Sequence, residues 1–120
     1  MLPLDRPLFL ASASPRRANL LRRLGVEFLQ HPPGVSEEMQ REERPEELVQ
    51  RLAVEKAQAG TRHAPERCLI IGCDTVVVSG TRILGKPRSR SEGREMLLSL
   101  AGRSHLVLSG LALLLRPEGQ

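Results

Sequence analysis

The chain has almost no aromatic residues. Phe9 and Phe28 are its only aromatic side chains among 120 residues, and it contains neither Trp nor Tyr. Proteins that bind single-stranded nucleic acids stack the bases on aromatic side chains. The composition therefore argues against such a platform, and it leaves only binding to a duplex through the phosphate backbone as a nucleic-acid function.

Histidine and cysteine are also scarce. The three histidines, at positions 31, 63 and 105, are scattered singly, and Cys68 and Cys73 match no C-x-x-C or zinc-ligand spacing. This argues against a histidine metal cluster or a zinc site. In a chain without an export signal, two thiols are most simply reduced, structural residues.

Long hydrophobic runs are absent as well. The longest apolar stretches are LIIGCDTVVV and LVLSGLALLL, which are too short and too interrupted to span a bilayer. The first residues, MLPLDRPLFLAS, lack the basic start and unbroken apolar centre of a signal peptide. We therefore expect a cytoplasmic protein that does not associate with membranes.

Positive charge is plentiful, but lysine is not. The net charge is +4 with a pI of about 10.0, which favours an anionic partner such as nucleic acid, an acidic membrane or a phosphorylated small molecule. Of the 18 basic residues 16 are arginine, and the lysines are Lys56 and Lys86. A surviving lysine can mark a place that needs a compact ammonium group, although codon bias explains the scarcity equally well.

Hydrophobic patterning predicts an α/β domain with a mixed sheet and flanking helices. We expect strands over 8–11, 26–31, 67–80 and 104–115, helices over 15–24, 45–60 and 91–101, and a hairpin that turns at 79–81. A mixed sheet with three helices normally needs more chain to cover both faces. We therefore expect one domain over residues 1–120 that is incomplete at its C-terminus.

The first helix carries two arginines at its positive end. Ser14 suits the N-cap and Pro15 the first helical position, so Arg16 and Arg17 fall in the first turn. The helix dipole opposes positive charge there, at a cost of about 0.3 to 1 kcal/mol for each exposed charge. A phosphate bound at the helix start, with Ser12 as a further donor, would explain both arginines. The alternative is that both side chains point into solvent at little cost.

Asp74 interrupts the most hydrophobic strand of the chain and is one of only two aspartates. A buried carboxylate must be paired or bound to a metal, because a bare buried charge is very costly. One interpretation is a bulge at Gly72, with Asp74 capping a neighbouring turn. We favour the other, in which Asp74 is a metal ligand or general base at the edge of a cleft, because α/β sheets bind ligands where strands end.

Lys56 is the second polar residue expected inside. At 100° per residue it falls within the apolar arc of helix 45–60, which is formed by Leu48, Val49, Leu52 and Ala53. Its ammonium group must either extend to solvent or meet an anion. By itself, Lys86 in LGKP fits a solvated loop, and the loop acids Glu37 and Glu38 fit one too.

Six motifs together resemble the Maf family, nucleotide pyrophosphatases first named as septum-formation inhibitors. They are LASASPRR (10–17), GVSE (34–37), VEKA (54–57), GCDTVV (72–77), LGKP (84–87) and SLAGRSHLV (99–107). Their order and approximate spacing match the family over essentially all of residues 8–115. The resemblance implies a two-lobed α/β fold related to the inosine triphosphate pyrophosphatases, with a cleft for a nucleoside triphosphate.

The implied reaction is hydrolysis between the α- and β-phosphates, which yields a nucleoside monophosphate and pyrophosphate. The implied cofactor is a divalent cation, Mg²⁺ before Mn²⁺ or Co²⁺, and the implied assembly is a homodimer that binds neither nucleic acid nor membrane. The DT pair at 74–75 resembles the branch that acts on dTTP and UTP. A nucleotide-binding regulator of septum formation that does not hydrolyse its ligand is the alternative.

The resemblance also assigns roles. Asp74 matches the family's proton acceptor, and Glu37 and Asp74 match residues that hold the metal. Arg16 and Thr75 match positions linked to base selection. The substrate-binding set corresponds to Ser12, Arg16, Arg17, Lys56 and Lys86. Three departures stand out: VSE replaces an aspartate–glutamate pair, Cys73 replaces a smaller residue, and the later family segment around DKAGAYGIQG does not occur within these 120 residues.

Overall fold

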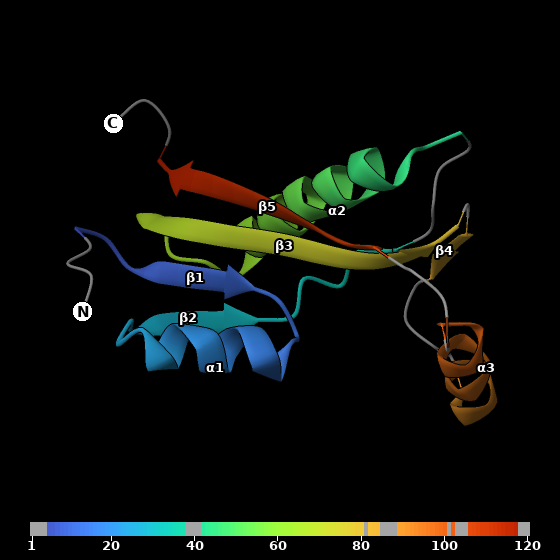
Figure 1. Cartoon of the computed structure of the whole chain (residues 1–120). Coiled ribbons are helices and arrows are strands. Elements are labelled where there is room, and N and C mark those ends of the chain that lie inside the picture. The colour runs from blue at the N-terminus through green and yellow to red at the C-terminus, as the bar shows by residue number, and fades with distance from the viewer. Residues whose placement is uncertain are drawn as a thin grey trace.

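The computed structural model describes residues 5–37, 42–80, 82–84, 89–100, 102 and 106–117. Strands and helices alternate along the chain, as expected from the sequence (Figure 1). In order they are β1 (Leu8–Ala11), α1 (Pro15–Arg23), β2 (Phe28–His31), α2 (Pro45–Ala59), the 3₁₀ turn η1 (Gly60–Arg62), β3 (Cys68–Ser79), β4 (Arg82–Leu84), α3 (Arg90–Leu100) and β5 (Leu106–Arg116).

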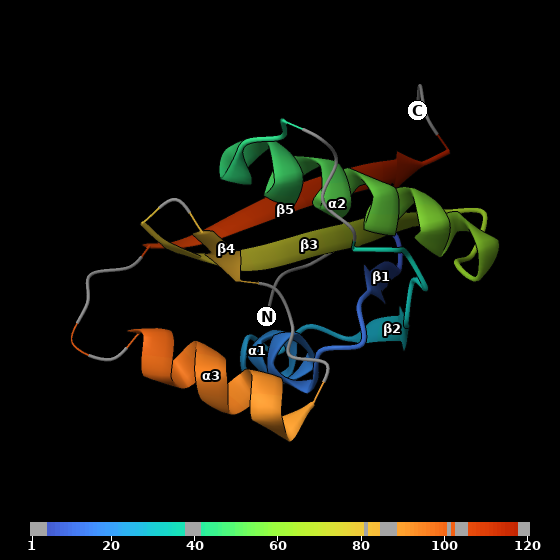
Figure 2. The same ribbon diagram turned by 90° about the vertical axis from the view of Figure 1, so that its right-hand side faces the viewer.

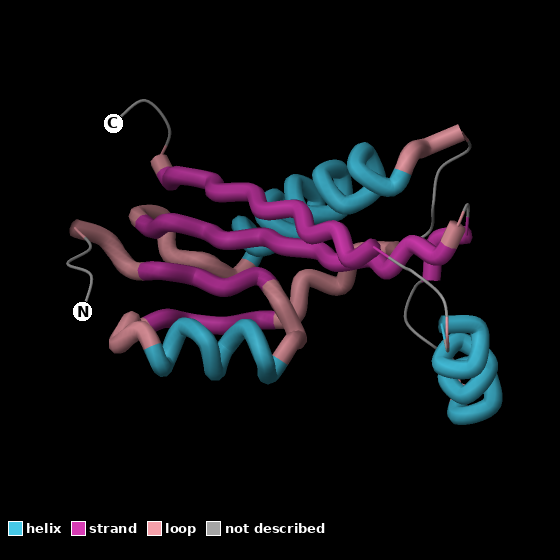
Figure 3. Tube along the Cα trace, in the orientation of Figure 1, coloured by secondary structure: helices cyan, strands magenta, loops and turns pink. Residues whose placement is uncertain are grey.

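The predicted mixed sheet is confirmed, and β3 is its centre. β1 is parallel to both β2 and β3, whereas β4 and β5 are antiparallel to β3. β3 is long enough to pair with β1 over its first part and with β4 over its last part, while β5 follows its other side (Figure 3). The β3–β4 hairpin expected from the turn at 79–81 is present.

The interpretation of Gly72 as a bulge is wrong. The β3–β5 register runs without interruption from Cys68 opposite Arg116 to Val78 opposite Leu106, straight through Gly72. A Cβ atom at Gly72 would lie 2.2 Å from the carbonyl oxygen of Ala53 in α2. Glycine is needed at this position because the helix backbone lies directly against the strand.

The core lies between α2 and one face of the sheet. Alternate residues of β3 point toward the helix, because successive side chains of a strand face opposite ways. They pack with apolar residues of α2 in two buried clusters, which include Phe9, Ala57 and Ile70 in one and Leu48, Leu52 and Val76 in the other. This packing fixes α2 relative to β3, and so fixes any side chain that projects between them.

The other two helices take no part in that core. α1 and α2 lie on opposite sides of the sheet (Figure 2). α3 stands away from the sheet beyond β4, with Leu97 and Leu98 exposed (Figures 1 and 2). Of the helices that the structure describes, none has the length and apolar character needed to cross a bilayer.

Several element boundaries differ slightly from those expected. The strand predicted from 26 begins at Phe28, and the helix predicted to end at 60 ends at Ala59 and continues as the 3₁₀ turn η1. The third helix covers 90–100, and the last strand covers 106–116, starting after residues 103–105, which lie outside the described part. These shifts leave the order of the elements and the hairpin as predicted.

Candidate active site

Three predicted site residues meet between α2 and β3. The Nζ atom of Lys56 donates hydrogen bonds to Oδ1 of Asp74 at 2.8 Å and to Oε1 of Glu37 at 2.7 Å. Lys56 comes from α2 and Asp74 from β3, while Glu37 belongs to the loop that follows β2. We call these three residues the carboxylate–lysine cluster.

The cluster places charge deep inside the protein. Lys56 is only 7% exposed and Asp74 only 5%. Burial lowers the pKa of Lys56, but hydrogen bonds and charge attraction from Asp74 and Glu37 outweigh it, so the pKa lies above its ordinary value. Lys56 is therefore an ammonium cation at neutral pH. Of the two alternatives that the sequence left open, it meets anions rather than extending to solvent.

Asp74 keeps one oxygen without a partner. Its Oδ1 accepts from Lys56, whereas its Oδ2 is buried and has no hydrogen-bond partner in the described part of the chain. Buried polar atoms are nearly always satisfied by protein, water or a bound group. This oxygen is thus free to accept a proton or to ligate a cation, as expected for a general base or metal ligand.

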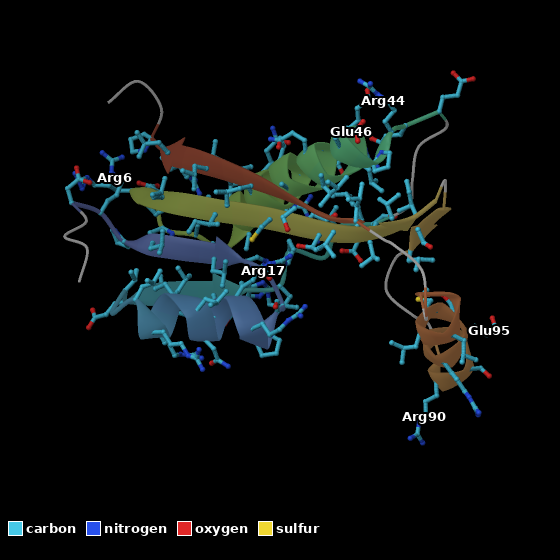
Figure 4. The ribbon with its side chains drawn as sticks, in the orientation of Figure 1. Arg6, Arg17, Arg44, Glu46, Arg90 and Glu95 are labelled. Carbon is cyan, nitrogen blue, oxygen red and sulfur yellow. The ribbon has the colours of Figure 1, made fainter. Side chains whose placement is uncertain are left out.

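A second group of predicted residues meets on the opposite face of the sheet. Thr75 follows Asp74 on β3, so its side chain points away from α2. Its Oγ1 accepts a hydrogen bond from Nη2 of Arg17 at 3.1 Å, and Nη1 of Arg17 lies 3.4 Å from Oγ of Ser12. Arg17 is labelled in Figure 4. We call Ser12, Arg17 and Thr75 the arginine–hydroxyl cluster.

The start of α1 supports this second cluster. The Oγ of Ser14 accepts from the backbone N–H of Arg17 at 3.3 Å, which confirms Ser14 as the N-cap. The Oγ of the buried Ser12 accepts from the N–H of Ser14 at 3.0 Å. The Arg17 side chain thus reaches from the start of α1 to β3, and its guanidinium group stays close to the N-terminal end of the helix through Ser12.

Both clusters lie just past the carboxyl end of β1, beside the middle of the central strand β3. The pairing of β1 with β3 ends where Ala11 faces Gly72, so Asp74 and Thr75 lie just beyond the carboxyl end of β1. Ligands of open α/β sheets bind just outside the carboxyl ends of the strands. Asp74 and Thr75 themselves lie in the middle of β3, not at its end, and the residues around them are divided between the two faces of the sheet.

Comparison with known proteins identifies the family of this chain. The family model described as "Maf-like protein" matches residues 7–120. The chain belongs to the Maf-like family. This confirms the resemblance carried by the six motifs, and the mixed α/β sheet with flanking helices is consistent with it.

Several curated relatives of this Maf-like chain are named dTTP/UTP pyrophosphatase. The one from Alkalilimnicola ehrlichii is 51% identical over 119 residues, covering 94% of this chain and 59% of the relative. Those from Syntrophus aciditrophicus and Salmonella typhimurium are 46% and 44% identical, covering 98% and 88% of this chain and 57% and 54% of theirs. The chain therefore spans a little over half the length of these relatives.

Two residues expected in the Maf-like site are not placed with the rest. Arg16 is exposed and makes no hydrogen bond or ion pair with any residue that the structure describes, so only one of the two arginines turns toward the sheet. Lys86 lies within 85–88, outside the described residues. The prediction for Lys86 stays a prediction.

Sequence reasoning missed three residues around the site. Ser109 on β5 lies 3.0 Å from Thr75 between the two hydroxyl oxygens, and Gln30 donates to the carbonyl oxygen of Ser12 at 2.9 Å. Burial raises the pKa of the Cys73 thiol, while the nearby charges of Arg17 and Lys56 lower it. A signal for Ser109 exists in the sequence: it is the one polar side chain within LVLSGLALLL.

The carboxylate–lysine cluster fits a divalent cation. Mg²⁺ prefers oxygen ligands, and the cluster offers two carboxylates that share Lys56: Glu37, and Asp74, whose Oδ2 has no partner among the described residues. The described residues contain no group of three or more His, Cys, Asp or Glu side chains arranged to hold a metal by themselves. A cation here would need ligands from water or substrate as well, which is usual for Mg²⁺.

Proposed function

We propose that this Maf-like chain carries the active site of a nucleoside triphosphate pyrophosphatase that acts on dTTP and UTP. The names of its curated relatives support this substrate class. The observation that carries the proposal is the state of Asp74, which is buried, held by Lys56 at one oxygen and without a partner at the other among the residues that the structure describes.

The proposed reaction is the hydrolysis of the bond between the α- and β-phosphates. The oxygen of a water molecule attacks the α-phosphorus while Oδ2 of Asp74 accepts a proton from that water. The bond from the α-phosphorus to the bridging oxygen breaks, and its electron pair leaves with pyrophosphate. Lys56 orients the Asp74 side chain by its hydrogen bond to Oδ1.

Charge neutralisation is the other requirement, because phosphoryl transfer depends mainly on positioning and electrostatic stabilisation. Arg17 and the start of α1 supply cationic and N–H donors, and we assign Arg16 and Lys86 to the same phosphate-binding set. Thr75, with Arg16, is assigned to base selection. A divalent cation, with Mg²⁺ favoured over Mn²⁺ or Co²⁺, would be held by Glu37 and Asp74 and would neutralise phosphate charge.

The direct test measures pyrophosphate released by this chain from dTTP, UTP, dCTP and dATP in the presence of Mg²⁺. We expect pyrophosphate and monophosphate in equal amounts, with dTTP and UTP preferred. Asp74→Asn is the matched control, because it keeps the side-chain size and removes the proton acceptor, and it should abolish turnover. Release of inorganic phosphate instead, or nucleotide binding without turnover, would contradict the proposal, and the second result would favour the regulator.

A further inference from the structure

Arg17 is a cation that the fold orients without neutralising. Its hydrogen-bond partners are the hydroxyl oxygens of Ser12 and Thr75, and none of its contacts within the described residues is to a carboxylate. Other arginines differ, since Arg51 is paired with Glu43 and Glu55, and Arg44 with Glu46 and Glu47. A guanidinium group held only by neutral hydroxyls keeps its full charge for an anionic ligand.

The hydrogen bonds around Arg17 continue to a residue that has no assigned role. Thr75 and Ser109 are directly opposite each other in the β3–β5 register, and their hydroxyl oxygens lie 3.0 Å apart. Both side chains are exposed, so water competes for every hydrogen bond that they make. Arg17 has no acceptor, so it can only donate to the Thr75 hydroxyl, which uses one lone pair of that oxygen. The hydroxyl proton and the second lone pair of Thr75 are left to hydrogen-bond with Ser109.

We propose that Ser109 is a positioning residue for substrate binding: through the Thr75 hydroxyl it holds the Arg17 guanidinium where a nucleotide phosphate binds. This inference rests on the proposed function and deepens it. Ser109 itself does not touch substrate. It fixes the direction of the Thr75 hydroxyl, and Thr75 then accepts from Nη2 of Arg17 while Ser12 contacts Nη1.

The test compares the affinity of several variants for α,β-methylene-UTP, a substrate analogue that cannot be cleaved at the α–β position. Loss of one neutral hydrogen bond corresponds to about a threefold to tenfold weaker affinity, so we expect this for Ser109→Ala. Ser109→Thr keeps a hydroxyl and should restore affinity. Ser91→Ala is the matched control, because it removes an exposed hydroxyl from α3 and should leave affinity unchanged.

A double-mutant cycle separates positioning from direct contact. If Ser109 acts only through Thr75, Ser109→Ala should have no further effect on affinity in the Thr75→Val background. Independent, multiplying effects of the two substitutions would overturn the inference, as would wild-type affinity of Ser109→Ala.

A measurement without nucleotide keeps this inference distinct from the proposed function. In ¹⁵N NMR spectra of the free protein, Ser109→Ala should speed the exchange of the Arg17 side-chain protons with water severalfold, while Ser109→Thr should not. If the wild-type chain fails to bind the analogue, the proposed function is wrong, and this exchange rate alone decides whether Ser109 holds Arg17. An unchanged exchange rate would overturn the inference.

Discussion

Gly110 of β5 lies directly opposite Asp74 of β3, on the face of the sheet that packs against α2. A Cβ atom at Gly110 would lie 2.4 Å from the carbonyl oxygen of Val49 in that helix. The missing side chain lets α2 approach the two strands closely. The same helix carries Lys56, so this close packing sets how Lys56 reaches Asp74.

Replacing Gly110 should therefore damage both stability and the carboxylate–lysine cluster. We expect Gly110→Ala to lower the free energy of unfolding by about 1 to 3 kcal/mol, because the added methyl group must push the helix backbone away. Urea unfolding measures this change. Leu111→Ala, at the next position and exposed on the opposite face, should stay within about 0.5 kcal/mol of wild type. Equal midpoints for the wild type and Gly110→Ala would contradict the close packing.

Removing one member of the buried ion pair should destabilise the protein strongly. Lys56→Met leaves Asp74 buried without its cation, and such a loss costs about 3 to 5 kcal/mol. Adding Asp74→Leu to this variant removes the stranded charge and should recover much of the loss. The measurement is the denaturant midpoint of each variant, with Gln58→Ala on the exposed side of α2 as control. A double variant less stable than Lys56→Met would refute this account.

The stability supplied by Lys56 should depend on pH in one direction. Its pKa in the folded protein lies above the ordinary value of 10.5, so folding favours the protonated form. The contribution is then fully present below the pKa of the unfolded chain and is lost as pH rises through the folded pKa. We expect the stability difference between wild type and Lys56→Met to be constant at neutral and mildly alkaline pH and to shrink above about pH 10.5. If the stability difference between the two proteins grew as the pH rose above neutral, this prediction would be wrong.

Much of this fold and site could be predicted because each feature has a local signature. The helix start at Ser14 and the buried position of Lys56 both follow from spacing and residue type. The division of the site between two faces depends on the strand register at Asp74 and Thr75, which no local pattern fixes. The role of Gly72 was misjudged for a similar reason, since the backbone that it contacts belongs to a helix 15 to 19 residues earlier in the chain.

The two cysteines should react slowly with thiol reagents in the folded protein. Burial raises the pKa of both thiols, and Cys68 is fully buried while Cys73 is partly exposed. Because the thiolate is the reactive form, we expect slow modification by Ellman's reagent at about pH 8, with Cys73 modified before Cys68. Cys68→Ala and Cys73→Ala report each thiol separately, and urea should make both react at once. Rapid modification of Cys68 in the native protein would argue against its burial.

Asp74 and Thr75 are neighbours in the chain but belong to opposite sides of one thin layer of backbone. As a result, substitutions on one side need not disturb the other. Under the proposed function, substitutions on the hydroxyl-bearing surface would alter nucleotide recognition, while the acid and its ammonium partner beneath helix α2 would remain as they are. Such independence would let natural variation change the proposed selectivity without rebuilding the proposed chemistry.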